Sequence, residues 1–165
     1  MIENGGLMFV RLILAAITVA ASTQAHAAAF NTDGVATGQT ESSILEFAPD
    51  HRVMNLRVDF SKFEMQDETH PMNQASGPCF GTVEIRAGAV EGNGVCVLDG
   101  LEGDRVLLGW VARRIDGNDV ISGYWNVNRG AGLWEKASGG GTFTLNMNAA
   151  NGATTNSLKG AVTLR

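Results

Sequence analysis

The sequence contains little proline and no concentration of positive charge. Of its 165 residues only 3 are proline, and 12 Lys and Arg are outnumbered by 17 Asp and Glu, giving a net charge of -5. The basic residues are scattered, so no patch is available to release counterions from a nucleic acid. The same scatter argues against strong adhesion to an anionic membrane surface. We therefore predict neither a nucleic-acid partner nor adhesion to lipid.

Several motifs that would define a chemistry are also missing from the sequence. There is no Gly-x-Ser-x-Gly motif and no paired Cys/His signature, so a hydrolase with a catalytic triad is not predicted. Neither Cys-x-x-Cys nor His-x-x-x-His spacing occurs, which argues against a zinc site. No Gly-Lys-Ser/Thr phosphate-binding motif is present. The sequence therefore predicts no cofactor, and it identifies no catalytic residue.

The one long apolar run lies near the N-terminus. The segment MFVRLILAAITVAASTQAHA has a cation at Arg11, an apolar run over residues 12–21, and small residues at Ala25 and Ala27. This order is typical of a secretory signal peptide. We predict that residues 1–27 are a signal peptide and that the mature chain reaches the periplasm or is secreted. The run is short for a membrane span, so a retained anchor is the weaker alternative.

The remaining residues, 28–165, are predicted to form one β-rich domain. They are rich in Gly, Asn, Thr and Val, and they contain no long stretch with apolar residues at helical spacing. Such a composition favours short strands joined by tight turns. The stretch RVMNLRVDF alternates apolar and polar residues from Met54 to Phe60, as in a strand with one buried face. We predict that this strand continues to Met65 and that a long loop follows.

Two further alternating stretches predict the clearest hairpin in the chain. CFGTVEIRAG and GNGVCVLDG flank a turn near AVEGNG. Pairing them brings Cys79 and Cys96 towards each other on neighbouring strands. Because the chain is expected in an oxidising compartment, we predict a disulfide between these two residues, with two free thiols as the alternative.

Four more strand-like stretches follow the hairpin: DRVLLGWVARR, DVISGYWNVNRG, GTFTLNMN and SLKGAVTLR. The gaps between them, such as IDGN and AANGATTN, have the chemistry of turns. With a first strand near VATGQTESSILEFA, the count reaches about eight strands. Their number and their short, regular spacing are typical of an antiparallel meander. We predict an all-β fold, an eight-stranded antiparallel barrel, with a β-sandwich as the alternative. Such a barrel is either filled by side chains or holds one small ligand.

Aromatic residues in the second half of the chain are candidates to line a ligand cavity: Trp110, Tyr124, Trp125 and Trp134. Packing of an ordinary core would also account for them. Adjacent residues of a strand face opposite sides of a sheet, so Tyr124 and Trp125 cannot both point into a barrel. One of the two is therefore predicted to face outward or towards a partner subunit.

The acidic turn DGLEGD places Asp99, Glu102 and Asp104 within six residues. Their oxygens could bind Ca²⁺, but the spacing is not that of an EF-hand loop. We predict a solvated turn and no metal site.

The loop after the strand that ends near Met65 carries a second group of polar residues: Glu64, Asp67, Glu68 and His70. We predict that this group is a solvated face. The functional alternative is that it forms the rim of a barrel mouth.

The stretch NVNRGAGLWEKASGGGTFTL is dense in glycine. Glu135 stands where a dinucleotide-binding loop would need its third glycine, and a strand rather than a helix follows. We predict the corner of a closed β-structure, where glycine permits positive φ angles and a close approach of strands while Trp134 anchors the turn. The stretch resembles the glycine-rich segment of the allene oxide cyclase and dirigent barrel group. The matching positions are Gly130, Gly132, Trp134, Ala137 and Gly139.

The hairpin and the acidic turn are also similar to those of small secreted bacterial proteins of this barrel type, so the resemblance covers roughly residues 79–145. It implies an eight-stranded barrel, often oligomeric, with an apolar cavity. Members of the group catalyse a cyclisation or guide the coupling of hydrophobic substrates. No family motif around an acid or a base matches this sequence, so the resemblance transfers no catalytic residue.

Three functions are compatible with these observations. The first is a secreted or periplasmic barrel that binds a small hydrophobic or aromatic ligand, or a protein partner, without catalysis. The second is a cyclase or isomerase, or a coupling guide, which would require a deep cavity containing a buried Asp, Glu or Arg. The third is an envelope interaction protein that uses exposed aromatic residues as a contact between subunits of a homo-oligomer.

Overall fold

The described part of the chain consists almost entirely of β-strands. The computed structural model describes residues 27–116 and 118–165, so the expected signal peptide lies outside it except for Ala27. The strands are β1 (Ala28–Asn31), β2 (Gly34–Ala48), β3 (His51–Met65), β4 (Gly77–Arg86), β5 (Ala89–Asp99), β6 (Arg105–Ile115), β7 (Ile121–Ala131), β8 (Ser138–Met147) and β9 (Ala153–Leu164). Three short 3-10 helices join them: η1 (Pro71–Gln74), η2 (Leu101–Gly103) and η3 (Gly132–Trp134).

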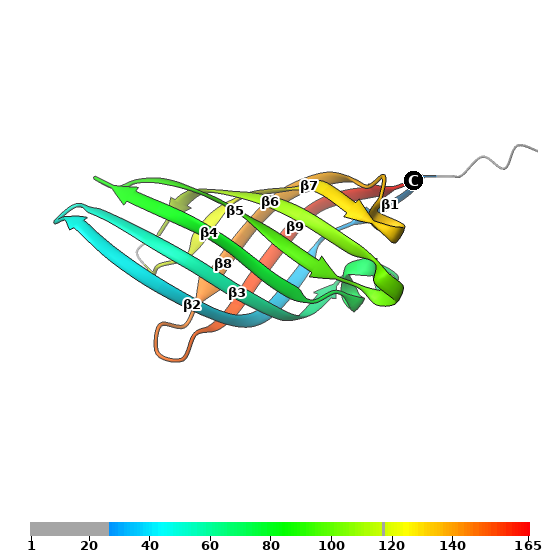
Figure 1. Cartoon of the computed structure of the whole chain (residues 1–165), viewed down its shortest axis with the longest axis horizontal. Helices are drawn as coiled ribbons and strands as arrows, with labels where there is room; N and C mark the ends of the chain where they lie inside the picture. Colours follow the sequence, from blue (N-terminus) through cyan, green and yellow to red (C-terminus); the bar gives the residue numbers. More distant parts are fainter. Residues whose placement is uncertain (1–26, 117) are drawn as a thin grey trace, which may run out of the picture.

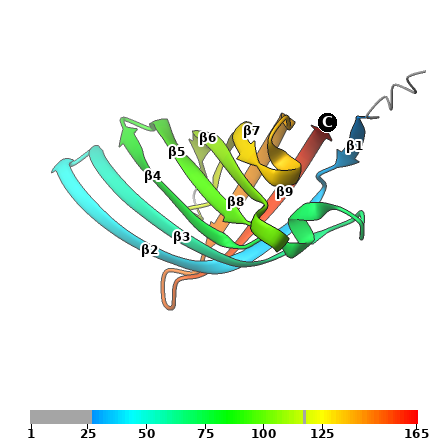
Figure 2. The ribbon, with the colours of Figure 1, turned by 45° about the vertical axis from the view of Figure 1, so that its right-hand side comes forward.

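Strands β2 to β9 close into an antiparallel barrel (Figure 1). Each strand pairs with the next one along the chain, and β9 pairs both with β8 and with residues 34–39 of β2. Strand β1 pairs with the last four residues of β9, so β1 and the start of β2 follow one another along the same edge (Figure 2). The prediction of an eight-stranded antiparallel barrel is therefore confirmed, with β1 as an additional strand.

Alternate residues of each strand fill the interior of the barrel. On β3 these are Met54, Leu56, Val58 and Phe60, as the sequence pattern predicts. The pairing of β3 with β2 then shifts, because Gly38 pairs with Phe60 and Thr37 with Lys62. The resulting β-bulge at residue 61 reverses the alternation. Phe63 consequently faces the interior together with Phe60, and both side chains are buried.

The two strands of the predicted hairpin, β4 and β5, do pair, but the predicted turn near AVEGNG is wrong: the strands turn at Ala87 and Gly88, and residues 89–94 belong to β5. Cys79 lies directly opposite Cys96, and the two residues form a disulfide. Both half-cystines are buried and belong to the core. The predicted hairpin and the predicted disulfide are thus confirmed together.

One end of the barrel is closed by irregular chain and the short helices η1, η2 and η3 (Figure 1). We refer to residues 66–76, which include η1, as the plug. Met72 in the plug is 1% exposed. The side chain of Asn73 ties the plug to the end of β3, since its Oδ1 accepts the Met65 N–H at 2.7 Å and its Nδ2 donates to the Asp67 carbonyl at 3.0 Å.

The glycine-rich stretch forms a corner at the same end of the molecule. Gly132 has a φ of +61°, and a side chain there would overlap the Asp104 carboxylate. The Asp104 Oδ1 accepts the Leu133 N–H at 2.8 Å, and Trp134 is 2% exposed. Further along, a Cβ on Gly141 would overlap the Lys159 carbonyl of β9. Glycine therefore provides both the turn and the close approach of β8 to β9, with Trp134 as the anchor.

Candidate functional site

The interior of the barrel contains a cavity of about 60 Å³. Its wall includes Leu56, Val58 and Phe60 of β3, Trp110 of β6, Trp125 of β7 and Phe143 of β8. The disulfide between Cys79 and Cys96 is also part of the wall. The cavity is thus a small apolar space. Its lining has the character of a small-molecule site, although its volume is well below the roughly 300–1,000 Å³ of such sites.

The ring of Trp110 has room on the interior face because β4 and β5 each have a glycine where the ring lies. A Cβ on Gly81 of β4 or on Gly94 of β5 would overlap the six-membered ring of Trp110. On its other side the ring meets Phe143 edge-on, with centroids 6.2 Å apart and an interplanar angle of 77°. Such T-shaped contacts favour one orientation of the two rings. Trp110 itself is half-buried.

Trp125 is the second indole in the wall, and it is 5% exposed. Its Nε1 donates a hydrogen bond of 3.1 Å to the carbonyl of Thr142 on β8. Because this polar atom already has a partner, Trp125 presents mainly its apolar ring surface to the cavity.

Among the residues that the structure describes, Asn156 of β9 is the only one in the cavity wall with an amide, hydroxyl or charged side chain. It faces the interior between Leu145 of β8 and Ala36 of β2, its partners in the two ladders. Its Oδ1 is buried and has no hydrogen-bond partner in the described part of the chain. More than nine in ten buried polar groups in proteins are satisfied, so this oxygen is an exception that requires an explanation.

The four aromatic residues singled out in the sequence occupy three different environments. Trp110 and Trp125 line the cavity. Tyr124 is 60% exposed, so of the adjacent pair it is Tyr124 that faces outward, as strand geometry requires. Trp134 is buried at η3 and is not part of the cavity wall. Tyr124 and Trp134 are therefore not cavity residues in this structure.

The acidic turn after β5 does not gather its three carboxylates. Asp99 forms an ion pair with Arg105, and this contact raises the pKa of the Arg105 guanidinium. Asp104 accepts the Leu133 N–H, whereas Glu102 is exposed in η2 with a φ of +54°. In residues 27–116 and 118–165 no three His, Cys, Asp or Glu side chains come together as a metal site.

His70 differs from the sequence-based prediction of a solvated polar face. Its side chain is 1% exposed, its Nδ1 accepts the Met72 N–H at 3.1 Å, and its Nε2 lies 3.3 Å from Thr32 Oγ1. Burial lowers the pKa of His70, although the charge of Asp67 acts in the opposite direction. His70 is thus a neutral structural group that attaches the plug to Thr32, while Glu64 and Glu68 are exposed as predicted.

Comparison with known proteins adds no further assignment. No protein-family model matches the chain, and a search of curated proteins found no significant match. In the described residues, no helix has the length and apolar character needed to cross a bilayer.

Asn156 was not among the predicted site residues, because the sequence AANGATTN has the composition of a turn. Strand β9 in fact begins at Ala153 and includes Asn156. A signal was available, since Thr154, Asn156 and Leu158 continue the period of two that is obvious in the following residues. The wall residue Phe143 lies in a strand that was predicted, but a single sequence does not reveal which strands meet across the interior.

Proposed function

We propose that this protein is a secreted or periplasmic barrel that binds one small apolar or aromatic molecule in its interior, without catalysis. The observation that carries the proposal is a cavity walled by aliphatic, aromatic and disulfide groups with a single amide at Asn156. Transfer of an apolar molecule from water into such a space is favourable. The disulfide is compatible with an oxidising destination.

The chemistry of the cavity wall supports binding over catalysis. Within residues 27–116 and 118–165, the lining contains no Asp, Glu, His, Lys or Arg, and both of its cysteines are joined in the disulfide. A general acid or base must lie within hydrogen-bond reach of the reacting atoms. A cyclase or isomerase, the activity that the family resemblance implies, would therefore have to find its proton donor outside this wall.

The size of the cavity limits what can enter. Its volume of about 60 Å³ is less than half of the roughly 150 Å³ of an apolar cavity that takes up benzene. A molecule with an aromatic ring would require a wall side chain to move. Trp110 is half-buried whereas Trp125 is buried, so we propose that the wall opens at Trp110.

Binding can be tested with furan and benzene as probes, observed by ligand-detected NMR. The expected result is saturable binding of furan, and weaker binding of benzene because of its size. The variant Leu145→Trp fills the cavity from β8 and should abolish both signals, whereas Thr144→Trp, one residue away on the outer face, should retain them. Absence of saturable binding in the wild type, or equal binding in both variants, would overturn the proposal.

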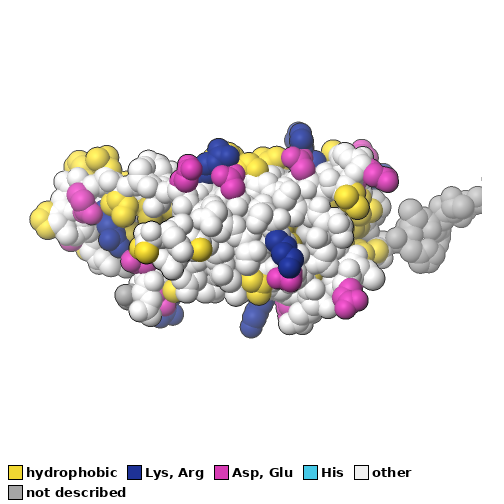
Figure 3. Space-filling model, turned by 90° about the horizontal axis from the view of Figure 1, so that it is seen from below, with side chains coloured by type: hydrophobic (Ala, Val, Ile, Leu, Met, Phe, Trp, Pro, Cys, Tyr) yellow, Lys and Arg dark blue, Asp and Glu magenta, His cyan; other side chains and the backbone are white. Residues whose placement is uncertain are grey.

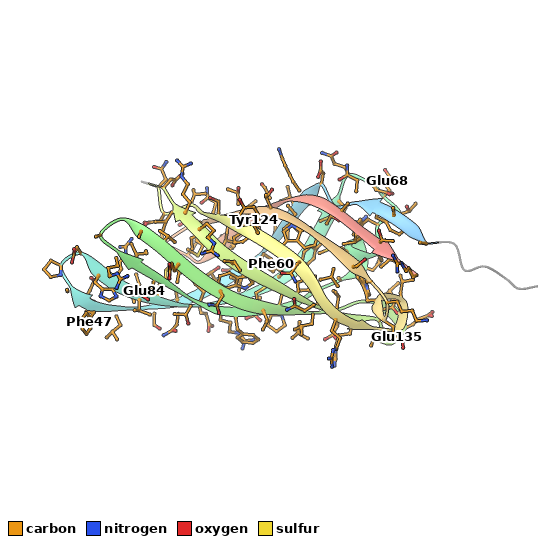
Figure 4. The ribbon with its side chains drawn as sticks, turned by 90° about the horizontal axis from the view of Figure 1, so that it is seen from above. Phe47, Phe60, Glu68, Glu84, Tyr124 and Glu135 are labelled. Atoms are coloured by element: carbon orange, nitrogen blue, oxygen red, sulfur yellow. A yellow bond between two sulfur atoms is a disulfide. The ribbon has the colours of Figure 1, made fainter. Side chains whose placement is uncertain are left out.

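A separate observation favours a second candidate function, that of an interaction protein that forms a homo-oligomer. Residues 34–39 of β2 pair with β9, but beyond them the described strands pair with β2 only on its β3 side. The free part of this edge carries Ile44, Leu45 and Phe47, which are 54%, 67% and 76% exposed. Figure 4 shows Phe47 at the outer tip of the hairpin formed by β2 and β3, and in Figure 3 hydrophobic side chains gather at that end of the molecule.

An exposed, apolar strand edge without Lys or Pro is a site for adding another strand. The partner proposed for this edge is a second copy of the chain, joined through antiparallel β2 strands. Size-exclusion chromatography with light scattering should then show a dimer that the double variant Ile44→Lys, Leu45→Lys converts to a monomer. Tyr124→Lys, a matched change of an exposed residue on β7, should leave the dimer intact. A wild-type protein that is monomeric at all accessible concentrations would exclude this candidate.

A further inference from the structure

We propose that Asn156 selects the ligand of the cavity, and that this ligand carries an N–H or O–H group which donates to the Asn156 Oδ1. The inference depends on the proposed binding function, because it concerns the same cavity. It goes further by assigning the residue that distinguishes one apolar molecule from another.

The side chain of Asn156 contains a buried oxygen acceptor, Oδ1, without a hydrogen-bond partner in the described chain. An unpaired buried acceptor destabilises a fold by about 1–3 kcal/mol. The cross-strand partners of Asn156 are the apolar residues Leu145 and Ala36, and no group of the described chain donates to its Oδ1. Asn156 is half-buried as a residue, but its Oδ1 is buried. The buried polar residues of the described chain have partners, since Thr154 bonds to Thr40, and His70 to Thr32 and to the Met72 N–H. Asn156 is therefore the exception in an interior that otherwise satisfies its polar groups.

Folding alone does not explain an asparagine at this position. The inward residues that follow it on β9 are Leu158, Val162 and Leu164, all buried and apolar. A leucine at position 156 would continue that series and would leave no polar atom unsatisfied. A binding site provides a reason for the amide, because a ligand donor would satisfy the oxygen on entering. The terminal torsion of Asn is soft, so a small rotation can turn the oxygen towards a ligand.

The wall also defines the class of ligand. No charged side chain of the described chain lines the cavity, and burying an unpaired ion is very costly, so the ligand is neutral. With a single polar side chain in the wall, the molecule should have one donor and an otherwise apolar body. Small heterocycles with one N–H and small phenols or alcohols belong to this class, whereas sugars and carboxylates do not.

The test compares pyrrole with furan, two five-membered rings of similar size that differ in the presence of an N–H donor. In the wild type, pyrrole should bind about tenfold more tightly than furan, the factor expected for one hydrogen bond to a buried acceptor. In Asn156→Leu the two probes should bind with equal affinity, because the acceptor is gone. Asn146→Leu, the same change at an exposed position of β8, should keep the tenfold preference.

A second measurement does not depend on the variants. The side-chain amide of Asn156 gives its own pair of signals in a proton–nitrogen NMR spectrum, and pyrrole should shift this pair while furan does not. If furan and pyrrole bind the wild type equally and leave these signals in place, the role of Asn156 is excluded while the binding function stands. If neither probe binds, the binding function itself is refuted, and the inference with it.

Discussion

Acidification should loosen the plug through His70. The ring is 1% exposed, its Nδ1 is occupied by the Met72 N–H, and its edge packs against Phe30 with centroids 5.4 Å apart. A proton on Nδ1 would remove the only acceptor for that N–H and would place a charge in an apolar site. Burial accordingly lowers the pKa of His70 below its ordinary value of 6.5.

The sign of the effect follows from this shift. Between the lowered native pKa and 6.5, the unfolded chain binds a proton at His70 that the native protein excludes, so stability falls as the pH falls. The contribution is fully present above pH 6.5 and is lost as the pH drops through the native pKa. One proton changes the free energy of unfolding by no more than about 1.4 kcal/mol per pH unit, which limits the loss between pH 6.5 and 5.0 to about 2 kcal/mol.

Urea unfolding followed by tryptophan fluorescence at pH 7.5, 6.5 and 5.0 would measure this loss. His70→Gln should be less stable than the wild type at pH 7.5 but should show a smaller decrease towards pH 5.0. His51→Gln is the matched control, because His51 lies on β3 away from the plug and contacts Glu84 at 2.8 Å. If His70→Gln retains the full pH dependence of the wild type, the reasoning about the plug is wrong.

Two further predictions concern the cavity wall. The Cys79–Cys96 disulfide links residues 17 apart, and in the chain-entropy model its reduction should lower the free energy of unfolding by about 3 kcal/mol. An unchanged urea midpoint after complete reduction would contradict this expectation. Gly94→Ala places a methyl group against the Trp110 ring and the Phe80 carbonyl, so it should destabilise the fold by about 1–3 kcal/mol and alter tryptophan emission. Gly100→Ala is the control, because its Cβ would meet nothing closer than 3.3 Å, and it should change neither the stability nor the tryptophan emission. Equal effects of the two substitutions would show that the ring of Trp110 does not pack on Gly94.

The sequence was sufficient for features that depend on neighbouring residues. The pairing of β4 with β5 could be predicted because two alternating stretches follow one another closely, and this pairing brings Cys79 and Cys96 onto neighbouring strands. The exact register could not be predicted, because the turn lies at residues 87–88 and not near AVEGNG. Strand geometry also predicted that only one of Tyr124 and Trp125 points inward, and the structure identifies Trp125 as that residue.

Features that depend on contacts between distant residues could not be predicted. The burial of His70 requires Thr32 and Phe30, which lie 38 and 40 residues earlier in the chain. The bulge at residue 61 depends on the pairing of β3 with β2, so the joint burial of Phe60 and Phe63 is hidden in a simple period of two. The closure of β9 on β2 also joins the two ends of the domain, but here the number of strands was enough to predict a barrel, although not its additional strand β1.

The way in which the interior is filled connects the fold to the proposed function. Gly81 and Gly94 have no side chains, and the ring of Trp110 occupies the space that side chains at these two positions would fill. Where many small side chains interlock, the packing of an interior does not depend on any single residue. Above Gly81 and Gly94, by contrast, the packing depends on the half-buried Trp110 alone. Displacing that ring would enlarge the cavity beyond its present 60 Å³ without moving any strand. Ligand entry should therefore change the surroundings of Trp110 before it changes those of Trp125, whose Nε1 is fixed to Thr142.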